Sequence, residues 1–389
     1  MKRVIQKGNI SMFSMSNLFE RLIDPETMKS VAYTAMKARG KGAYYREYYS
    51  NNQVPPELIR LRKALIMGKA IPPCKRNPKI IYEASADKYR EILPPTDDEH
   101  IVHHLICNAF LPVLTRGMYE YSVASIPGRG GFYGKKHMER WIRSFDSPMY
   151  VLKLDIHHFF QSINRSILYY KLIRHSRDKR FNSLLVKVLW HDCPELLDGV
   201  TPSNNTGIPI GFYTSQWFAN YYLQDFDHFI KEDLHIEYYM RYMDDMVLIS
   251  PDIDKLKDSL SDISDYLNNI GLHIKDSKTQ LYMFSYTYND KEYGNFIDFM
   301  GFTFHCNRTC IRKSTLKRIR RKCINIIKRK RQHKSISWYA SAQALSLLGR
   351  LTDTNTYAYS KKYLLKNSDK YKLRRIVSKH SKILNEKVI

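Results

Sequence analysis

The sequence predicts a mixed α+β protein, and three stretches support this fold class. Residues 235–242 and 246–250 are rich in Tyr, Met, Val, Leu and Ile, so they are expected to form a hairpin of two short strands. Residues 149–155 form an almost uninterrupted apolar segment, which is typical of a central strand buried on both faces. Residues 312–334 carry 12 Lys or Arg among 23 positions, with apolar residues interleaved at roughly helical spacing. That pattern predicts a helix with a packed side and a basic side.

The composition indicates a large basic protein that binds a polyanion. With 389 residues, of which 43% are apolar, the chain can bury substantial cores and is too long for one compact unit. Its formal net charge of +25 exceeds what solubility requires and attracts phosphate backbones. The basic helix has two other interpretations, a merely solvated face or contact with an acidic membrane or protein.

Two adjacent carboxylates, Asp244 and Asp245, are expected at the turn of the hairpin. Because they repel each other, a divalent cation between them is favoured, although an ordinary solvated Asp-Asp turn is the alternative. Asp155 ends the apolar strand, where a charge is costly unless a metal or another charge compensates it. Asn164 is a plausible cap for the helix that follows. An ordinary aspartate at a strand end is the other interpretation of Asp155.

Three carboxylates on neighbouring strands suit two-metal phosphoryl transfer, in which one ion activates a 3′-hydroxyl and the other steadies the leaving pyrophosphate. We expect two Mg²⁺ ions, with Mn²⁺ as an alternative. The candidate metal ligands are Asp155, Ile156, Asp244 and Asp245.

These residues belong to a series of motifs that resembles the reverse transcriptases in order and separation. The resemblance runs from about residue 17 to residue 380. The motifs that carry it are, in chain order, Asp155 with Phe160, residues 207–220, Tyr242 to Asp245, Gly271 and Leu272 with Lys278, and Asp298 to Phe302.

The resemblance implies a right-hand polymerase with an antiparallel-sheet palm and a basic helical thumb. Residues 1–147 would form an N-terminal extension and the fingers, 148–295 the palm, and 296–389 the primer grip and thumb. It also implies an RNA-directed DNA polymerase that takes an RNA template, a DNA or RNA primer and dNTPs. An accessory protein or a structured non-coding RNA is a further expected partner.

The resemblance assigns roles to residues around the nucleotide. Asp155, Asp244 and Asp245 are the expected catalytic carboxylates, and Lys278 would protonate or neutralise the pyrophosphate unless it is a plain surface lysine. The expected substrate-binding residues are Phe160 as the gate against ribose, Arg90 with Lys88 on a fingers hairpin formed by residues 79–83 and 89–93, Gly211 beside the template base pair, Gln216 and Tyr242. The alternatives are a core Phe160, a structural ion pair at Arg90 and a simple turn at Gly211.

Nucleic-acid contacts are expected from three segments. The Gly-rich stretch 126–136 lacks the spacing of a nucleotide-triphosphatase loop and is read as a backbone contact, or otherwise as a structural turn. The primer grip and the basic helix are the other two segments. The residues concerned are Arg129, Lys135, Lys136, Gly301, Lys317, Arg318, Arg320 and Arg321.

The second palm motif indicates the subgroup. Pro209 to Gly211, followed by Thr214 to Gln216, looks closer to the enzymes of diversity-generating retroelements than to those of retrons or group II introns. Phe212 stands where those enzymes typically carry Asn, so a phage-defence reverse transcriptase, templated or template-independent, stays open. A non-catalytic RNA-binding scaffold with the same fold is the alternative from another functional class.

Other site types are disfavoured. The six cysteines form no Cys-x-x-Cys pair, which argues against zinc. No apolar run is long enough to span a bilayer, and nothing resembles a secretory signal peptide. We therefore expect a cytoplasmic protein with reduced cysteines and no membrane partner. Residues 286–294 are expected to form an exposed loop.

Overall fold

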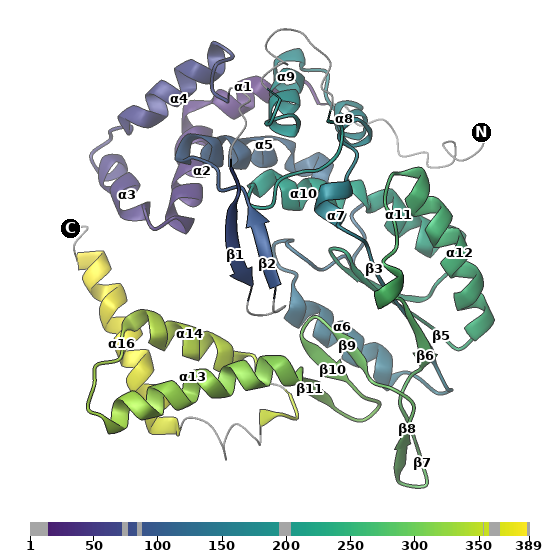
Figure 1. Ribbon diagram of the computed structural model, residues 1–389. Coiled ribbons are helices and arrows are strands. Elements are labelled where there is room, and N and C mark those ends of the chain that lie inside the picture. The colour runs from purple at the N-terminus through teal and green to yellow at the C-terminus, as the bar shows by residue number, and fades with distance from the viewer. Residues whose placement is uncertain are drawn as a thin grey trace.

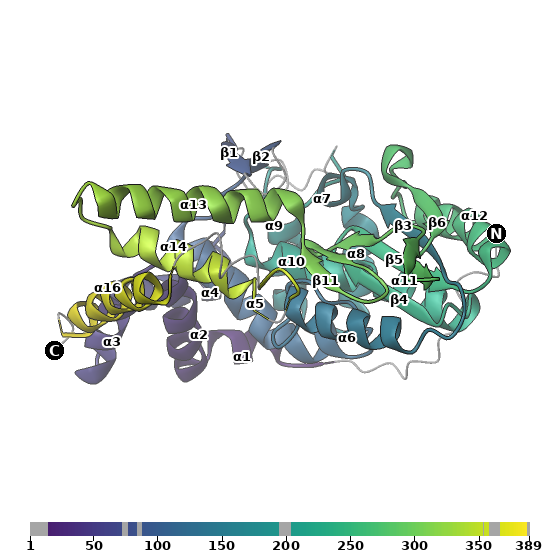
Figure 2. The ribbon, with the colours of Figure 1, turned by 90° about the horizontal axis from the view of Figure 1, so that it is seen from below.

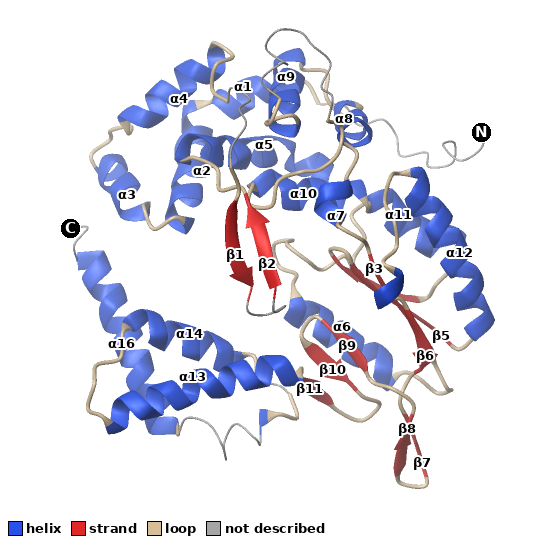
Figure 3. Ribbon diagram, viewed as in Figure 1, coloured by secondary structure: helices blue, strands red, loops and turns tan. Residues whose placement is uncertain are grey.

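The structure is a computed structural model that describes residues 15–71, 77–83, 88–193, 204–352, 354–357 and 366–386. It contains both helices and antiparallel strands, as the sequence predicts (Figure 1, Figure 3).

The N-terminal part is helical, with one hairpin. Helix α5 begins at a capping box in which Thr96 and Glu99 satisfy each other's backbone N–H groups. The hairpin pairs β1 with β2 in antiparallel register, close to the bounds expected for a fingers hairpin. The elements are α1 (Leu18–Ile23), α2 (Pro25–Ala38), α3 (Gly42–Ser50), α4 (Pro56–Ile66), β1 (Lys79–Glu83), β2 (Lys88–Ile92), α5 (Asp97–Thr115) and α6 (Gly131–Arg143).

A four-stranded antiparallel sheet in the order β4-β5-β3-β6 occupies the middle of the chain. Its interior strand β3 is the apolar segment that the sequence singles out. Asn164 caps α8 by accepting a hydrogen bond from the Ile167 N–H at 3.0 Å, as predicted. The elements are β3 (Tyr150–Asp155), α7 (Phe159–Ser162), α8 (Arg165–Ile173), α9 (Lys179–Leu189), α10 (Tyr213–Tyr222), α11 (Gln224–His228), β4 (Tyr238–Tyr242), β5 (Asp245–Ser250), α12 (Ile253–Asn269), a 3-10 turn (Asp276–Lys278) and β6 (Gln280–Met283).

Alternate side chains of the strands point to opposite faces of this sheet, and a hydrophobic core covers each face. Leu152 and Leu248 belong to a core shared with the helices of the N-terminal half and with α12. Val151 and Val247 belong to a second core that includes α6 and the strands after β6. The catalytic candidates at the ends of β3 and β5 are therefore fixed between two packed layers.

In the residues that the structure describes, the C-terminal part consists of small sheets and three helices. Helix α13 covers the predicted basic segment, and it packs beside α14, which in turn packs beside α16 (Figure 2). Residues 286–294, expected as a loop, form the exposed hairpin β7–β8 instead, because Tyr286 and Tyr293 pair across it. The elements are β7 (Tyr286–Tyr288), β8 (Lys291–Tyr293), β9 (Ile297–Phe299), β10 (Phe302–Phe304), β11 (Thr309–Ile311), α13 (Lys313–Arg331), α14 (Trp338–Gly349) and α16 (Asn367–Glu386).

Candidate active site

The carboxylates that the sequence predicts to act together lie at one end of the central sheet. Asp155, the last residue of β3, is paired in register with Asp245, the first residue of β5. The Asp244 carbonyl accepts a hydrogen bond from the Ile156 N–H at 3.2 Å. Asp245 is thus a strand residue rather than a turn residue. The turn itself consists of Met243, whose φ of 56° is left-handed, and Asp244.

Burial makes the ionised form of these carboxylates less favourable. Asp155 is buried, and Asp244 and Asp245 are half-buried. Loss of solvation raises the pKa of Asp244 and of Asp245, and the negative charge of Asp155 raises both further. A cation placed among the three would relieve this repulsion.

Lys278 supplies one such positive charge. Its Nζ lies 2.5 Å from Asp155 Oδ2, although about half of the lysine side chain is exposed. Burial lowers the pKa of Lys278, but the hydrogen bond and the charge of Asp155 outweigh it, so the pKa is raised overall. Lys278 is brought there by the 3-10 turn, next to the hydrogen bond from the Lys275 N–H to the Asp155 carbonyl.

The carboxylates offer the oxygen ligands that a hard cation prefers, but their side chains are not arranged as a complete metal site. Within the described ranges, no group of three or more His, Cys, Asp or Glu side chains is arranged to hold a metal ion. Lys278 pairs with Asp155 Oδ2, an oxygen that a metal ion would also use. The donors nevertheless fit Mg²⁺ or Mn²⁺, since both ions prefer carboxylate oxygens, and burial together with the charge of Asp155 raises the pKa of Asp244 and of Asp245.

A buried ion pair, which the sequence did not lead us to expect, supports the acidic turn. Arg241 on β4 is fully buried and makes two hydrogen bonds with Asp227 of α11, from Nε to Oδ1 at 2.7 Å and from Nη2 to Oδ2 at 2.6 Å. Its remaining nitrogen, Nη1, donates to the Met243 carbonyl at 3.2 Å and to Asn220 Oδ1 at 3.2 Å. The guanidinium therefore anchors the residue that precedes Asp244. A charged residue inside an apolar strand was the available signal.

Comparison with known proteins places this geometry in a family. The family model described as "Reverse transcriptase (RNA-dependent DNA polymerase)" matches residues 81–332. The chain belongs to the reverse transcriptase family. Members of this family are nucleotidyltransferases and generally use divalent metal ions. Membership, together with the helices and antiparallel strands described above, confirms the expected right-hand polymerase fold.

Solved structures with some likeness to this reverse transcriptase are telomerases from Candida tropicalis. The apo telomerase truncated from its C-terminal domain is 15% identical, with a TM-score of 0.40, over 60% of this chain and 54% of that one. The telomerase in complex with the TWJ fragment of telomeric RNA is 12% identical, with a TM-score of 0.45, over 85% and 58%. The apo telomerase is 14% identical, with a TM-score of 0.44, over 76% and 57%. The chain thus spans little more than half the length of these proteins.

Two further comparisons complete this picture. No curated protein matches the sequence significantly. In the part of the chain that the structure describes, no helix is both long and apolar enough to cross a bilayer.

Backbone hydrogen bonds join the three segments that carry the nucleotide-site candidates Phe160, Gly211 and Arg90. Phe160 is half-buried next to the buried Phe159, and its carbonyl accepts a hydrogen bond from the Ile208 N–H at 2.8 Å. The Ile210 carbonyl in turn accepts from the Leu93 N–H at 2.8 Å, just past β2. The first motif, the second motif and the fingers hairpin are therefore tied together.

Gly211 has a structural requirement of its own at this junction. Its φ is +123°, and an added Cβ would lie 2.7 Å from the Leu93 carbonyl oxygen. Any other residue would clash with the backbone at Leu93 and adopt a strained φ. This contact accounts for the glycine without reference to a template base pair, so a template contact stays a prediction.

For the other substrate candidates, the structure gives an exposure or a position in a helix or strand. Gln216 is exposed on α10, although its neighbours Ser215 and Trp217 are buried, and Tyr242 is 38% exposed beside the acidic turn. Arg90 is half-buried on β2, opposite Ile81. Lys88 begins β2, but its side chain lies outside the described residues.

Two of the predicted nucleic-acid contacts are engaged inside the protein. Arg129 donates to the carbonyls of Tyr119 at 2.6 Å and Ser122 at 3.1 Å. Lys135 is buried, with its Nζ 2.8 Å from a carboxylate oxygen of Glu139. The contacts of Arg129 favour the structural-turn interpretation, whereas Lys135 lies in helix α6 and forms its ion pair within that helix. The sequence shows the charge of Arg129 but not its partners, whereas Glu139 follows Lys135 at the i,i+4 spacing that favours an ion pair on a helix.

Most of the remaining nucleic-acid candidates are accessible. Lys136 is exposed on α6, and nothing lies within 4 Å of a Cβ added to Gly301 at the β9–β10 turn. On α13, Ile319, Cys323 and Ile326 are buried, and the cationic side chains occupy the other faces. Lys317, Arg320 and Arg321 are exposed there, and Arg318 is half-buried.

Proposed function

We propose that this protein is an RNA-directed DNA polymerase that extends a DNA or RNA primer with dNTPs on an RNA template. The observation that carries the proposal is the register of Asp155 opposite Asp245, with Asp244 beside them, in a chain that belongs to the reverse transcriptase family. A scaffold has no need for three clustered carboxylates at the end of a buried sheet.

The residues around the carboxylates support specific tasks. Asp155, Asp244 and Asp245 would hold two Mg²⁺ ions, or Mn²⁺ in their place, together with the backbone carbonyl of Ile156, the one oxygen that this residue offers. When bound, such ions supply Lewis acidity to the attacking 3′-hydroxyl and to the leaving pyrophosphate. Lys278 keeps its proton, as its raised pKa indicates, and stands ready to neutralise the pyrophosphate.

Substrate selection would fall to the junction of the three segments. The Phe160 ring would lie beneath the incoming sugar and exclude a 2′-hydroxyl. Arg90 would bind the triphosphate, because a planar guanidinium makes paired hydrogen bonds to phosphate oxygens. Lys88, Gln216 and Tyr242 are proposed as further contacts of the nucleotide.

The nucleic acid would lie along the basic helix. The exposed cations of α13 match a phosphate backbone in charge. The Gly301 carbonyl, in the proposed primer grip, accepts a hydrogen bond from the Arg312 N–H at 3.0 Å, directly before this helix. We propose the fingers, palm and thumb boundaries given above, and a role within a diversity-generating retroelement. A defence-associated reverse transcriptase is the second candidate, because Phe212 departs from the retroelement pattern and is buried against the rings of His103 and His191.

The test is the sequence of the DNA made from a defined RNA in the presence of Mg²⁺. The full chain is compared with a variant carrying Asp244→Ala and Asp245→Ala, and with a control carrying Asp262→Ala and Asp265→Ala on the exposed face of α12. Copies of the RNA from the first and third proteins, with none from the second, support the proposal. DNA unrelated to the RNA would mean untemplated synthesis. Equal synthesis by the double alanine variant would refute the site, and no synthesis by any protein would leave an RNA-binding scaffold.

A further inference from the structure

Helix α4 exposes large apolar side chains on the face that does not pack into the core. Leu58, Leu61 and Leu65 of this helix are buried. Ile59 is 60% exposed and Ile66 is 47% exposed, as is Met67, at 53%, just after the helix. Ile59 and Ile66 are two helical turns apart, so they lie on the same side about 10 Å from each other. Three aliphatic side chains gathered this way form a patch suited to a partner.

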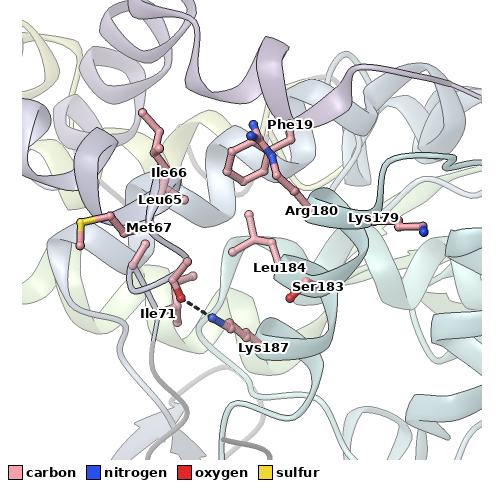
Figure 4. A pocket seen from close by; sticks show the side chains of 12 residues that line it. Phe19, Leu65, Ile66, Met67, Ile71, Lys179, Arg180, Ser183, Leu184 and Lys187 are labelled. Carbon is pink, nitrogen blue, oxygen red and sulfur yellow. Dashed lines mark hydrogen bonds between the residues drawn. The ribbon is translucent and has the colours of Figure 1, made fainter.

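The surface around this patch is hollowed on both sides of α4. One hollow, of about 340 Å³, is lined by Leu65, Ile66 and Met67, by Phe19 of α1 and by residues of α9 (Figure 4). The other, of about 560 Å³, is lined by Met28, Val54, Leu58, Ile59 and again by Ile66 and Met67. Because the two hollows share Ile66 and Met67, they form one continuous surface, which we call the α4 surface.

The rim of the α4 surface is positively charged. Its cations are Arg62, Lys63, Lys179, Arg180 and Lys187, and no described residue that lines either hollow is acidic. Arg62 donates to the Ile23 carbonyl and also interacts with the charge of Asp24, whereas Lys187 donates to the Gly68 carbonyl, an uncharged acceptor. Arg180 does pair with Glu20, at 2.6 Å. The remaining positive charge calls for an acidic partner.

The α4 surface is built from elements that do not carry the catalytic candidates. Helix α4 packs on α1 and α2, and α9 packs on α1 and α8. Asp155, Asp244 and Asp245 lie instead on β3, β5 and the turn before β5. Occupation of this surface is therefore separable from nucleotide chemistry.

We propose that the α4 surface docks an acidic amphipathic helix of a partner protein. Such a helix would place apolar side chains two turns apart against Ile59, Ile66 and Met67, with carboxylates toward Arg62, Lys63 and the cations of α9. An RNA would use the cations but gain little from three aliphatic side chains between them. The apolar patch therefore favours a protein over an RNA as the partner that binds the α4 surface.

The proposal is tested with a fluorescein-labelled helical peptide that has leucines along one face and glutamates elsewhere. Its affinity for the full chain is measured by fluorescence anisotropy at near-physiological salt. A second peptide of equal charge, with serines in place of the leucines, reports adsorption to a basic protein in general. We expect tight binding of the leucine peptide alone. Ile66→Ser should weaken this binding by about tenfold or more, because the variant can no longer bury this aliphatic side chain against the peptide.

The matched control is Ile324→Ser, because Ile324 is also 47% exposed on a basic helix, α13. This variant should keep the peptide affinity of the original protein, and Ile66→Ser should keep its rate of DNA synthesis. Equal binding of the two peptides, or an unchanged affinity in Ile66→Ser, would overturn the proposal. So would a loss in Ile66→Ser of RNA affinity, or of self-association in sedimentation, because the surface would then belong to RNA or to a second copy of the chain.

Discussion

At the residue scale, Phe160 is the side chain with the most direct consequence for substrate choice. It follows the buried Phe159, and its own ring is half-buried, so part of it stays accessible where the first and second motifs meet. A core phenylalanine would not need this accessibility. The hydrogen bond from the Ile208 N–H to the Phe160 carbonyl fixes the backbone of Phe160. A fixed position is needed if the ring is to exclude a sugar that carries one additional hydroxyl.

Phe160→Ala should admit ribonucleotides. Loss of the ring removes the steric barrier to a 2′-hydroxyl, and we expect ribonucleotide incorporation to rise by about tenfold or more relative to deoxynucleotide incorporation, which corresponds to roughly 1.4 kcal/mol of lost discrimination. Single-nucleotide extension of a primer measures both rates. Tyr170→Ala, which truncates a 64% exposed ring on α8, serves as the control and should leave the ratio unchanged. Unaltered discrimination in Phe160→Ala would remove the gate role.

At the element scale, the hairpin β4–β5 is held by a contact that crosses elements. Arg241 connects α11, through Asp227, to the left-handed turn residue Met243. It also joins the segment before α6, since its N–H donates to the Tyr121 carbonyl and its carbonyl accepts from the Val123 N–H. The position of Asp244 thus depends on three parts of the chain.

Arg241→Met should destabilise the protein and slow DNA synthesis. It leaves the buried Asp227 carboxylate without its counterion, which typically costs about 3–5 kcal/mol. Adding Asp227→Asn removes that charge and should recover part of the free energy of unfolding, measured by urea denaturation. Synthesis should stay slow in the double variant, because the Met243 carbonyl still lacks its donor. Full recovery of both quantities would mean that the pair does not position the turn.

Helix α13 shows how one element divides its faces between packing and binding. Its buried residues repeat at intervals of four and three positions, from Ile319 through Cys323 to Ile326. Ile324 falls outside this stripe and is 47% exposed. The cations on the open faces are free of core packing and can follow a phosphate backbone.

Replacing Lys317, Arg320 and Arg321 with Gln should weaken nucleic-acid binding and flatten its dependence on salt. For each phosphate that the variant no longer neutralises, the slope of log affinity against log salt should fall by about 0.7–0.9. Fluorescence anisotropy with a labelled RNA–DNA duplex across a salt series gives the slope. The control neutralises Lys255 and Lys257 on α12 and should keep the original slope. An unchanged slope in the α13 variant would place the nucleic acid elsewhere.

At the scale of the whole molecule, the sequence predicted what local pattern encodes. The strand before Asp155, the acidic hairpin, the cap at Asn164 and the basic helix follow from hydrophobic period and turn chemistry, and the structure confirms each of them. Partners that are distant in sequence leave no such pattern. The Arg241–Asp227 pair and the internal hydrogen bonds of Arg129 arise when separate segments meet in space, whereas Lys135 and Glu139 are four residues apart on α6, a spacing that the sequence does show. Charge alone could not separate those residues from surface cations.

The acidic site should also limit the stability of the entire fold. The raised pKa values of Asp244 and Asp245 mean that their ionised forms are less favourable in the folded protein than in the unfolded chain. In their protonated form the two carboxyl groups stabilise the fold, and this contribution is fully present at a pH below their unfolded pKa. It is lost as pH rises through their folded pKa. Asp244→Asn with Asp245→Asn, measured near neutral pH with a chelator present, should therefore raise the melting temperature, by roughly 1 °C per kcal/mol recovered in a chain of 389 residues.

The same double variant should make no DNA, so stability and activity would move in opposite directions. Differential scanning calorimetry at several pH values provides the check, since the gain over the original protein should shrink as pH falls and the original carboxylates become protonated. Asp262→Asn with Asp265→Asn, on the exposed face of α12, should show no such gain at any pH. Added Mg²⁺ should stabilise the original protein and leave the Asn variant unchanged, because the metal relieves the repulsion that the amides have already removed. A lower melting temperature for the Asn variant in chelator would show that the carboxylates stabilise the fold instead.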